Sequence, residues 1–224
     1  MKCLFCKQEY HPSYSIKDLL FHPFLGQASL CPNCSQALQK VDAKEEHCPY
    51  CGHRDVPCQE CELWRKQYHL QHQSLYYYDD WGREFMERYK IKGEYSLRHC
   101  FQKEIYIALH SYQKEGFILC PIPLTKTKRE QRGFSQVEGL LEASHLSYCS
   151  FLEKIHEETQ GLKNKVERLK TPYMFALKEG SIVQNKKICL VDDIYTTGRT
   201  ITYGYDCLQK GGAKEVVSFS LWRA

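Results

Sequence analysis

Two neighbouring carboxylates and the short loop after them form the part of the sequence best suited to chemistry. Asp192 and Asp193 follow the apolar run 188–191 directly. The loop offers hydroxyl, backbone N–H and guanidinium donors on Thr196, Thr197, Gly198, Arg199 and Thr200. Such donors at the start of a helix suit an anion, whereas carboxylates only accept and need hydroxyls or a metal ion. A sugar phosphate satisfies both requirements, because it brings hydroxyls to the carboxylates and phosphate to the loop.

This order of apolar strand, acidic pair and Thr/Gly loop resembles the phosphoribosyl-pyrophosphate (PRPP) motif of type I phosphoribosyltransferases. The resemblance implies that Asp192 and Asp193 hold the ribose hydroxyls and that residues 196–200 hold the 5′-phosphate. If the site is catalytic, pyrophosphate leaves the anomeric carbon, Mg²⁺ offsets its charge, and the acidic pair stabilises the developing ribosyl cation. An ordinary strand-to-helix turn with a solvated acidic pair is the alternative.

Cysteines supply the second group of residues with a chemistry of their own. Eight of the 13 cysteines form four C-x-x-C pairs within the first 61 residues. In a reducing cytosol such pairs are typical of metal ligands, and eight thiolates make two closed, structural zinc sites. We predict sequential pairing, with cross-bracing as the alternative. The predicted ligands are Cys3, Cys6, Cys31 and Cys34 for one zinc, and Cys48, Cys51, Cys58 and Cys61 for the other.

A basic segment follows the second strand that we expect in the sheet. It carries Lys126, Lys128, Arg129 and Arg132. A loop at this place would face the same crevice as the Thr/Gly loop, because ligands bind beyond the carboxyl ends of parallel strands. The cations suit either the pyrophosphate of PRPP or the phosphates of DNA, and the sequence leaves both open. A solvated charged loop is the third interpretation.

The elements that must position these residues alternate between strands and helices. The patterns predict strands at 74–78, 117–120, 149–152, 173–177, 188–191 and 216–221, and helices at 81–92, 97–112, 134–145, 160–168 and 198–209. Such alternation predicts an α/β fold with a mainly parallel sheet flanked by helices. We expect it at residues 66–224. Residues 1–65 are too few for a good core of their own and are expected to form a small zinc-binding domain.

The composition sets broad limits on function. A formal net charge of +4 permits nucleic-acid binding without requiring it. No apolar run approaches the ~20 residues of a membrane span, and no signal segment precedes Cys3, so we expect a cytoplasmic protein. Residues 76–78 are tyrosines that could stack on bases, although the core is the commoner destination for such side chains. The unpaired cysteines are expected to be small buried hydrophobes: Cys100, Cys120, Cys149, Cys189 and Cys207.

Nearly from end to end, the order of these parts resembles the ComF family. The matching stretches include the cysteine pairs, the acidic motif, Pro121-Ile122-Pro123-Leu124, Arg132-Gly133-Phe134-Ser135-Gln136 and Ser220-Leu221-Trp222-Arg223. The resemblance implies a double zinc ribbon before a type I phosphoribosyltransferase-like sheet, and a late competence function in DNA uptake for transformation. It also implies single-stranded DNA as ligand, a ComFA-like helicase ATPase as partner, and recruitment to the inner face of the membrane.

The chain departs from the family pattern at three places. Ser135 replaces an Asn, Lys154 stands where Arg is common, and residues 171–173 replace an Asn-Pro-Phe-like flap. None of these touches the acidic pair or the Thr/Gly loop, so the sequence predicts PRPP binding more strongly than turnover. The alternatives are an active phosphoribosyltransferase acting on a nucleobase or nucleotide, and a zinc-ribbon scaffold with a relic PRPP motif.

Overall fold

A four-stranded parallel sheet with the strand order β1-β6-β5-β2 forms the centre of the fold. Its strands are β1 (His72–Tyr77), β2 (Phe117–Pro121), β5 (Lys187–Tyr195) and β6 (Glu215–Arg223). The computed structural model describes residues 1–12, 29–41, 48, 50–54, 56, 58, 61, 70–155 and 174–224. The predicted parallel α/β sheet is confirmed.

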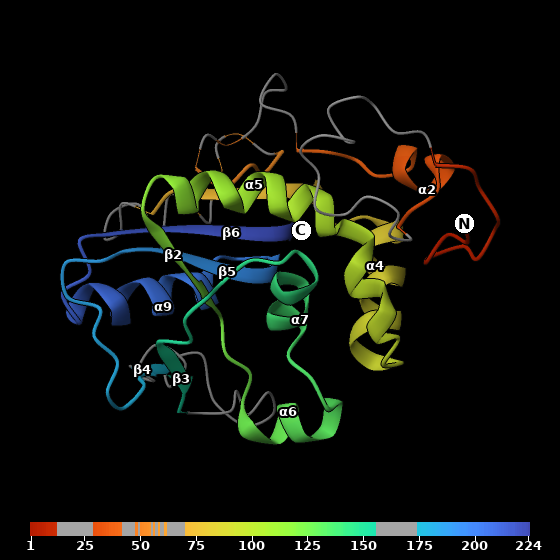
Figure 1. Cartoon of the computed structure of the whole chain (residues 1–224). Coiled ribbons are helices and arrows are strands. Elements are labelled where there is room, and N and C mark those ends of the chain that lie inside the picture. Colours follow the sequence, from red (N-terminus) through yellow and green to blue (C-terminus); the bar gives the residue numbers. More distant parts are fainter. Residues whose placement is uncertain are drawn as a thin grey trace, which may run out of the picture.

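Helices cover both faces of this sheet. The α-helices are α2 (Pro32–Gln36), α4 (Asp80–Met86), α5 (Gln102–Lys114), α6 (Lys126–Arg132), α7 (Gln136–Ala143) and α9 (Arg199–Lys210). A π-helical turn, η1 (Glu87–Ile91), continues α4, and a 3-10 helix, η2 (Tyr95–Phe101), precedes α5. Figure 1 shows α5 on one face of the sheet and α9 on the other. Of the helices that the structure describes, none combines the length and apolar character of a membrane span.

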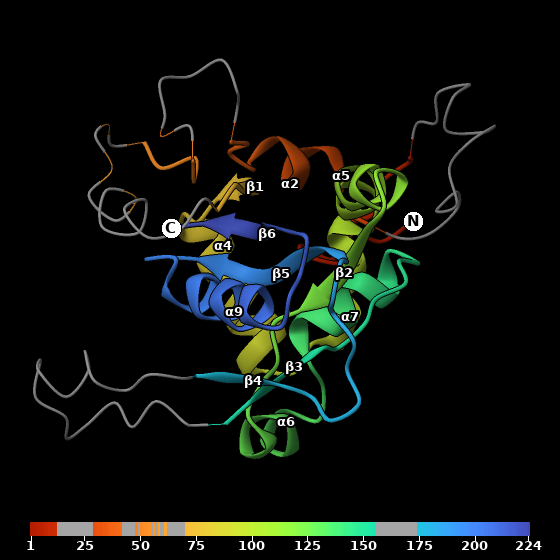
Figure 2. The same ribbon diagram turned by 90° about the vertical axis from the view of Figure 1, so that its left-hand side faces the viewer.

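Most predicted elements lie within a few residues of their expected bounds. The strand predicted at 149–152 is misplaced: the observed strand β3 (Leu152–Lys154) begins only at residue 152, the last residue of the predicted strand. β3 pairs with β4 (Phe175–Leu177) in a separate antiparallel sheet, which lies near α6 in Figure 2. The predicted helix at 160–168 and the flap residues 171–173 lie outside the described residues.

The basic segment after β2 is the helix α6, whereas its charge had suggested a loop. Thr125 is its N-cap, and the Thr125 hydroxyl accepts a hydrogen bond from the N–H of Lys128 at 3.3 Å. The helix ends at Gly133, whose φ of 75° lies in the left-handed region that favours glycine. A capping threonine and a terminal glycine therefore define a short helix that the charge pattern concealed.

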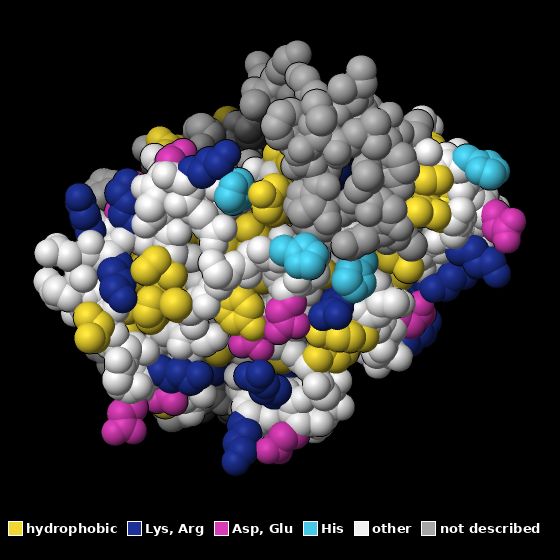
Figure 3. All heavy atoms as spheres, in the orientation of Figure 1, with side chains coloured by type: hydrophobic (Ala, Val, Ile, Leu, Met, Phe, Trp, Pro, Cys, Tyr) yellow, Lys and Arg dark blue, Asp and Glu magenta, His cyan; other side chains and the backbone are white. Residues whose placement is uncertain are grey.

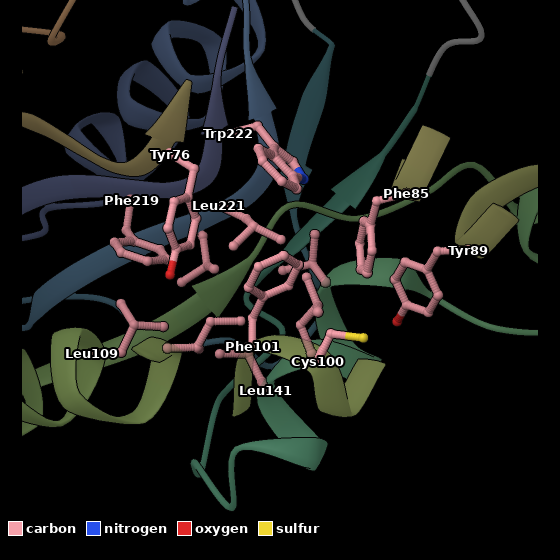
Figure 4. Packing of buried hydrophobic residues seen from close by; sticks show 14 of the residues in the cluster. Tyr76, Phe85, Tyr89, Cys100, Phe101, Leu109, Leu141, Phe219, Leu221 and Trp222 are labelled. Carbon is pink, nitrogen blue, oxygen red and sulfur yellow. The ribbon is translucent and has the colours of Figure 1, made fainter. Parts of the chain in front are cut away.

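An aromatic core joins β6 to the helices that follow β1. The Phe101 ring lies edge-on to Trp222 and Phe85, with centroids 5.4 and 5.0 Å away (Figure 4). Tyr89 in η1 is also buried, and its hydroxyl donates to the backbone carbonyl of Gln136 at 3.0 Å. The core therefore fixes η1 against the beginning of α7.

The cysteine-rich N-terminal residues pack against the β1 edge of the sheet. Val41 donates its backbone N–H to the carbonyl of Leu75 at 3.0 Å, and Tyr77 donates to the carbonyl of Gln39 at 2.8 Å. Residues 39–41 thereby supply hydrogen-bond partners to a strand that would otherwise have an open edge.

Aromatic and cysteine side chains divide between the core and the surface. Tyr76 and Tyr77 are buried, in agreement with the core as their expected destination. The prediction of buried unpaired cysteines is confirmed at Cys100, Cys120 and Cys189. It is wrong at Cys149, which is exposed, and at Cys207, which is partly exposed. Cys149 precedes β3, and although its backbone N–H donates to the carbonyl of Leu119 in β2 at 2.9 Å, its side chain is exposed.

Candidate functional site

The acidic pair lies near the carboxyl end of β5. Oδ1 of Asp192 accepts the backbone N–H of Asp193 at 2.9 Å, and Lys90 in η1 donates its ammonium to Oδ2 of Asp193 at 3.2 Å. Burial, followed by the negative charge of Asp193, raises the pKa of Asp192 to about 7, although Lys90 and Lys154 act in the opposite direction. Its environment therefore favours the protonated form of Asp192 more than that of an ordinary aspartate.

Beyond the carboxyl ends of β2 and β5 lies a cleft of about 270 Å³. The acidic pair lines it, together with the hydroxyl residues Thr196 and Thr200. Four cationic side chains line it as well: Lys90, Lys128, Arg132 and Lys154. Figure 3 shows Lys and Arg side chains over α6 and beside the β3–β4 pair, at the lower edge of that face. Cations, hydroxyls and carboxylates in one cleft fit a ligand that carries both phosphate and hydroxyl groups.

The predicted site residues divide into two sets. Those that line the cleft are Asp192, Asp193, Thr196, Thr200, Lys128 and Arg132. Thr197, Gly198 and Arg199 belong to the same loop without lining the cleft, and the Arg199 guanidinium lies 5.5 Å from the ring centroid of Tyr203. Lys126 and Arg129 do not line it either, and the exposed Arg129 forms an ion pair with the largely shielded Glu138 at 3.2 Å. The binding and catalytic roles of all these residues remain predictions.

Gly198 shapes the loop between β5 and α9. Its φ is 74°, and a Cβ at this position would lie 2.2 Å from the hydroxyl oxygen of Tyr195. The carbonyl of Gly198 accepts the side-chain hydroxyl of Thr202 at 2.9 Å. Both the backbone conformation and the contact with Tyr195 thus require glycine, and they fix the N-terminus of α9 beside the cleft.

Two cleft residues were missed by sequence reasoning. Lys90 lies in a π-helical turn, a feature that its sequence does not announce. Gln136 is 1% exposed; its Oε1 accepts from Nη1 of Arg132 at 3.0 Å, and its Nε2 has no hydrogen-bond partner among the described residues. A buried amide donor without a partner fits a ligand oxygen in the cleft. Its place in the Gly-Phe-Ser-Gln stretch was the available signal.

Ser135 retains the function of a helix cap. Its hydroxyl accepts the backbone N–H of Glu138 at 3.4 Å, at the N-terminus of α7. This is the geometry that Ser, Thr, Asn and Asp share at N-caps. The serine therefore preserves the start of the helix that carries Gln136.

The two cysteine sets are separate, and their pairing is sequential as predicted. The sulfurs of Cys3, Cys6, Cys31 and Cys34 lie within 4.8 Å of one another, and so do those of Cys48, Cys51, Cys58 and Cys61. The Cys6–Cys31 and Cys51–Cys58 sulfur separations are both 3.7 Å. A tetrahedron with Zn–S bonds of about 2.3 Å has edges of roughly 3.8 Å. A disulfide would bring sulfurs to about 2.05 Å. Both clusters therefore fit Zn²⁺ as ligand sets of four cysteines.

Arg223 ties the second cluster to the loop after β5. Its Nη2 donates to Sγ of Cys51 at 3.4 Å, while its Nη1 donates to the carbonyls of Tyr195 at 3.1 Å and Thr196 at 3.0 Å. A hydrogen bond from Cys61 and, further, the charge of Arg223 lower the pKa of Cys51 to about 4. Both effects favour the thiolate form of Cys51, the form that binds a metal.

Comparisons with known proteins match both parts of the chain. Residues 132–224 match the Phosphoribosyl transferase domain family. The whole chain is 37% identical to the competence protein ComFC of Streptococcus pneumoniae, with both chains fully covered. It is 32% identical to the competence protein ComFC of Bacillus subtilis, over 99% of this chain and 95% of that protein. It is 22% identical to the competence protein F of Haemophilus influenzae, over 100% of this chain and 97% of that protein.

Proposed function

Because the chain belongs to the ComFC family of competence proteins, we propose that it acts in DNA uptake for natural transformation. In this function it binds single-stranded DNA and a ComFA-like helicase ATPase, in the cytoplasm at the inner face of the membrane. Its cleft binds PRPP with Mg²⁺. The observation that supports PRPP binding is that Asp192 and Asp193 line the same cleft as Lys128 and Arg132.

PRPP matches the groups that line the cleft. Its ribose hydroxyls donate to Asp192 and Asp193, the groups that can only accept when ionised. Its 5′-phosphate accepts from the hydroxyls of Thr196 and Thr200 and from the N-terminus of α9, where backbone N–H groups and the helix dipole favour an anion.

The pyrophosphate of PRPP takes the other side of the cleft. Lys128 and Arg132 from α6 supply positive charge there, and Nε2 of Gln136, which has no partner among the residues that the structure describes, supplies a further donor. Mg²⁺ prefers oxygen ligands and keeps part of its water, so the pyrophosphate and one carboxylate of the acidic pair suffice to hold it. The ion offsets the pyrophosphate charge when bound.

The proposed function also includes two structural zinc ions, one in each cysteine cluster. Each cluster offers four cysteine sulfurs, a closed set without a position for substrate. Zinc there stabilises the N-terminal residues that hold these cysteines. Their packing on β1 then depends on the metal.

DNA phosphates are assigned to the cations of α6 that lie outside the cleft. Lys126 and Arg129 are exposed, and neither lines the cleft, so PRPP and DNA can use different residues of one helix. Single-stranded DNA bound in this way releases counterions, and its affinity falls as salt rises.

A second candidate function is phosphoribosyl transfer to an acceptor. The observation that favours it is that Asp192 and Asp193 line the cleft, where burial and then the charge of Asp193 raise the pKa of Asp192 to about 7, near the value that suits a general acid or base. Release of pyrophosphate from PRPP with a nucleobase or nucleotide, lost in Asp193→Asn, would support it.

Thermal stability of the zinc-loaded protein with PRPP and Mg²⁺ tests the cleft. A ligand that binds only the native state must raise the melting temperature. We expect a rise in the wild type and none in an Asp192→Asn/Asp193→Asn variant. No rise in either protein would contradict the PRPP site.

A labelled oligonucleotide titrated at several salt concentrations tests the DNA surface. Each phosphate contact contributes about −0.7 to the slope of log affinity against log salt for single strands. A Lys126→Gln/Arg129→Gln variant is expected to lose about 1.4 of this slope, while Lys114→Gln, at the exposed end of α5, keeps the wild-type slope. Absence of binding at low salt would exclude the proposal.

A further inference from the structure

Arg223 is a buried cation that lies between the loop after β5 and the second cysteine cluster. It is 2% exposed. Its hydrogen bonds within the described part of the chain go to backbone carbonyls and to one sulfur atom. Burying a charge is costly unless an opposite charge lies close to it. A negative partner therefore stabilises the guanidinium, and the carbonyls of Tyr195 and Thr196 do not supply that charge.

The second cysteine cluster provides that negative charge. Four thiolates around one Zn²⁺ carry a formal net charge of about −2. Sγ of Cys51, which belongs to this cluster, accepts from Nη2 of Arg223 at 3.4 Å. Without the metal, no shared bond to the other three sulfurs fixes the position of Sγ of Cys51 beside Arg223.

The other side of the same guanidinium contacts the start of the Thr/Gly loop at 196–200. Nη1 donates to the carbonyls of Tyr195 and Thr196, and Thr196 lines the cleft. The guanidinium carbon also lies 5.0 Å from the ring centroid of Tyr195, whose hydroxyl closely approaches Gly198. A shift of Arg223 therefore moves both the backbone and the ring against which the loop is folded.

We propose that Arg223 is a positioning residue that couples metal occupancy of the second cysteine cluster to the conformation of the loop at 196–200. With Zn²⁺ bound, Cys51 holds the guanidinium and the guanidinium holds the loop in its binding conformation. Without Zn²⁺, Sγ of Cys51 is no longer fixed beside the guanidinium, and the loop loses this anchor. The consequence for PRPP affinity rests on the proposed function; the coupling itself does not.

The first cluster offers a matched control. Arg88 donates from Nη1 to the carbonyl of Phe5, which lies between two ligands of that cluster, at 3.0 Å. Its charge is already paired with Glu94, because Nη2 of Arg88 and Oε2 of Glu94 are 2.7 Å apart. Neither residue contacts the Thr/Gly loop in the described structure, so changes at the first cluster should leave that loop unaffected.

Hydrogen exchange without ligand tests the coupling directly. We expect the amides at 196–200 to exchange about tenfold faster in Cys58→Ala than in the wild type, whereas Cys31→Ala, in the first cluster, leaves them unchanged. Amides of β2 should stay protected in both variants, which shows that the sheet is intact. Unchanged exchange at 196–200 in Cys58→Ala would overturn the proposal.

Arg223→Lys decides the matter if Cys58→Ala fails to fold. This variant keeps every cysteine and the positive charge, but one ammonium cannot reach the sulfur and both carbonyls together. Half of the zinc should pass to a chelating dye about tenfold faster than in the wild type, with faster exchange at 196–200; Arg88→Lys should show neither change at that loop. Wild-type rates in Arg223→Lys would contradict the coupling.

PRPP titrations separate this proposal from the one on which it partly depends. Arg223→Lys is expected to bind PRPP with Mg²⁺ about tenfold more weakly than the wild type, and Arg88→Lys equally well. If the wild type itself does not bind PRPP, the proposed function fails, and the exchange and zinc-release rates still decide whether Arg223 couples the two sites.

Discussion

Lys90 and Asp193 are 103 positions apart in the sequence, yet the ammonium of one lies 3.2 Å from Oδ2 of the other. Both are largely shielded, with side chains 28% and 12% exposed. The pair is held by packing, because the neighbouring Tyr89 is buried in the aromatic core and bonded to Gln136. A cation fixed by the core thus compensates a carboxylate fixed by the sheet.

Removing Lys90 should leave that carboxylate without compensation. We expect Lys90→Met to lower the free energy of unfolding by about 1–2 kcal/mol in urea denaturation, because a largely buried charged group loses its partner. Lys92→Met is the control: its pair with Glu87 is more than half exposed, so the expected loss is under about 0.5 kcal/mol. Equal losses in the two variants would contradict the assigned importance of the buried pair.

Asp192 should make PRPP binding depend on pH. Burial and Asp193 raise its pKa to about 7, whereas ribose hydroxyls donate to the ionised form. Affinity should therefore rise with pH through 7 and be about tenfold weaker at pH 6 than at pH 8. Calorimetric titration of Asp192→Asn with PRPP measures how much of the pH dependence comes from protonation of the ligand's own phosphates. An identical pH profile in both proteins would mean that Asp192 is not involved.

The same raised pKa also determines whether stability rises or falls with pH. Between about pH 4 and pH 7 the native protein keeps a proton on Asp192 that the unfolded chain has lost. The contribution of Asp192 to the free energy of unfolding should therefore fall as the pH rises through this window and level off above it. The difference in stability between wild type and Asp192→Asn, measured at several pH values, checks this slope.

Gln136 should matter more to ligand binding than to folding. Its Nε2 lacks a partner among the described residues, so Gln136→Glu loses no hydrogen bond of the free protein and keeps the acceptor for Arg132. We expect PRPP affinity at least tenfold weaker by thermal shift, because a donor becomes an acceptor facing phosphate. Gln113→Glu, on exposed α5 surface, should bind normally. Normal binding by Gln136→Glu would exclude a ligand contact there.

Metal content should follow the cluster assignment. Elemental analysis of the purified protein is expected to find two zinc ions per chain, since each cluster supplies four cysteine ligands. Cys34→Ser should bind about half as much zinc as the wild type, and its melting temperature should be clearly lower. Cys149→Ser, at an exposed cysteine outside both clusters, should keep the wild-type zinc content and melting temperature. A single zinc in the wild type would be incompatible with two closed sites.

Local sequence signals account for what could be predicted. The strand, acidic pair, loop and helix around Asp192 are contiguous, so their types and order are readable from the chain, and so is the spacing of each cysteine pair. The beginning of α7 was also signalled, by a serine followed three residues later by Glu138.

Long-range packing accounts for the rest. Lys90 reaches the cleft only because a π-helical turn is fixed by an aromatic core that joins distant elements. Arg223 meets Cys51 across 172 positions, and no local pattern marks a guanidinium that will be buried beside a cysteine cluster. The missing partner of Gln136 is likewise a property of the folded cleft, because any exposed glutamine would be satisfied by water.

The position of β6 has a consequence for the newly made chain. It is synthesised after every other strand of the sheet, yet it lies between β1 and β5. At ordinary rates of translation, on the order of ten seconds separate the emergence of β1 from that of β6. During this interval residues 39–41 protect one edge of β1, but the edge that will receive β6 remains open to other chains. The tendency of the nascent protein to aggregate should therefore depend on the time between the synthesis of β1 and that of β6. A chaperone that binds β1 during this interval would reduce it.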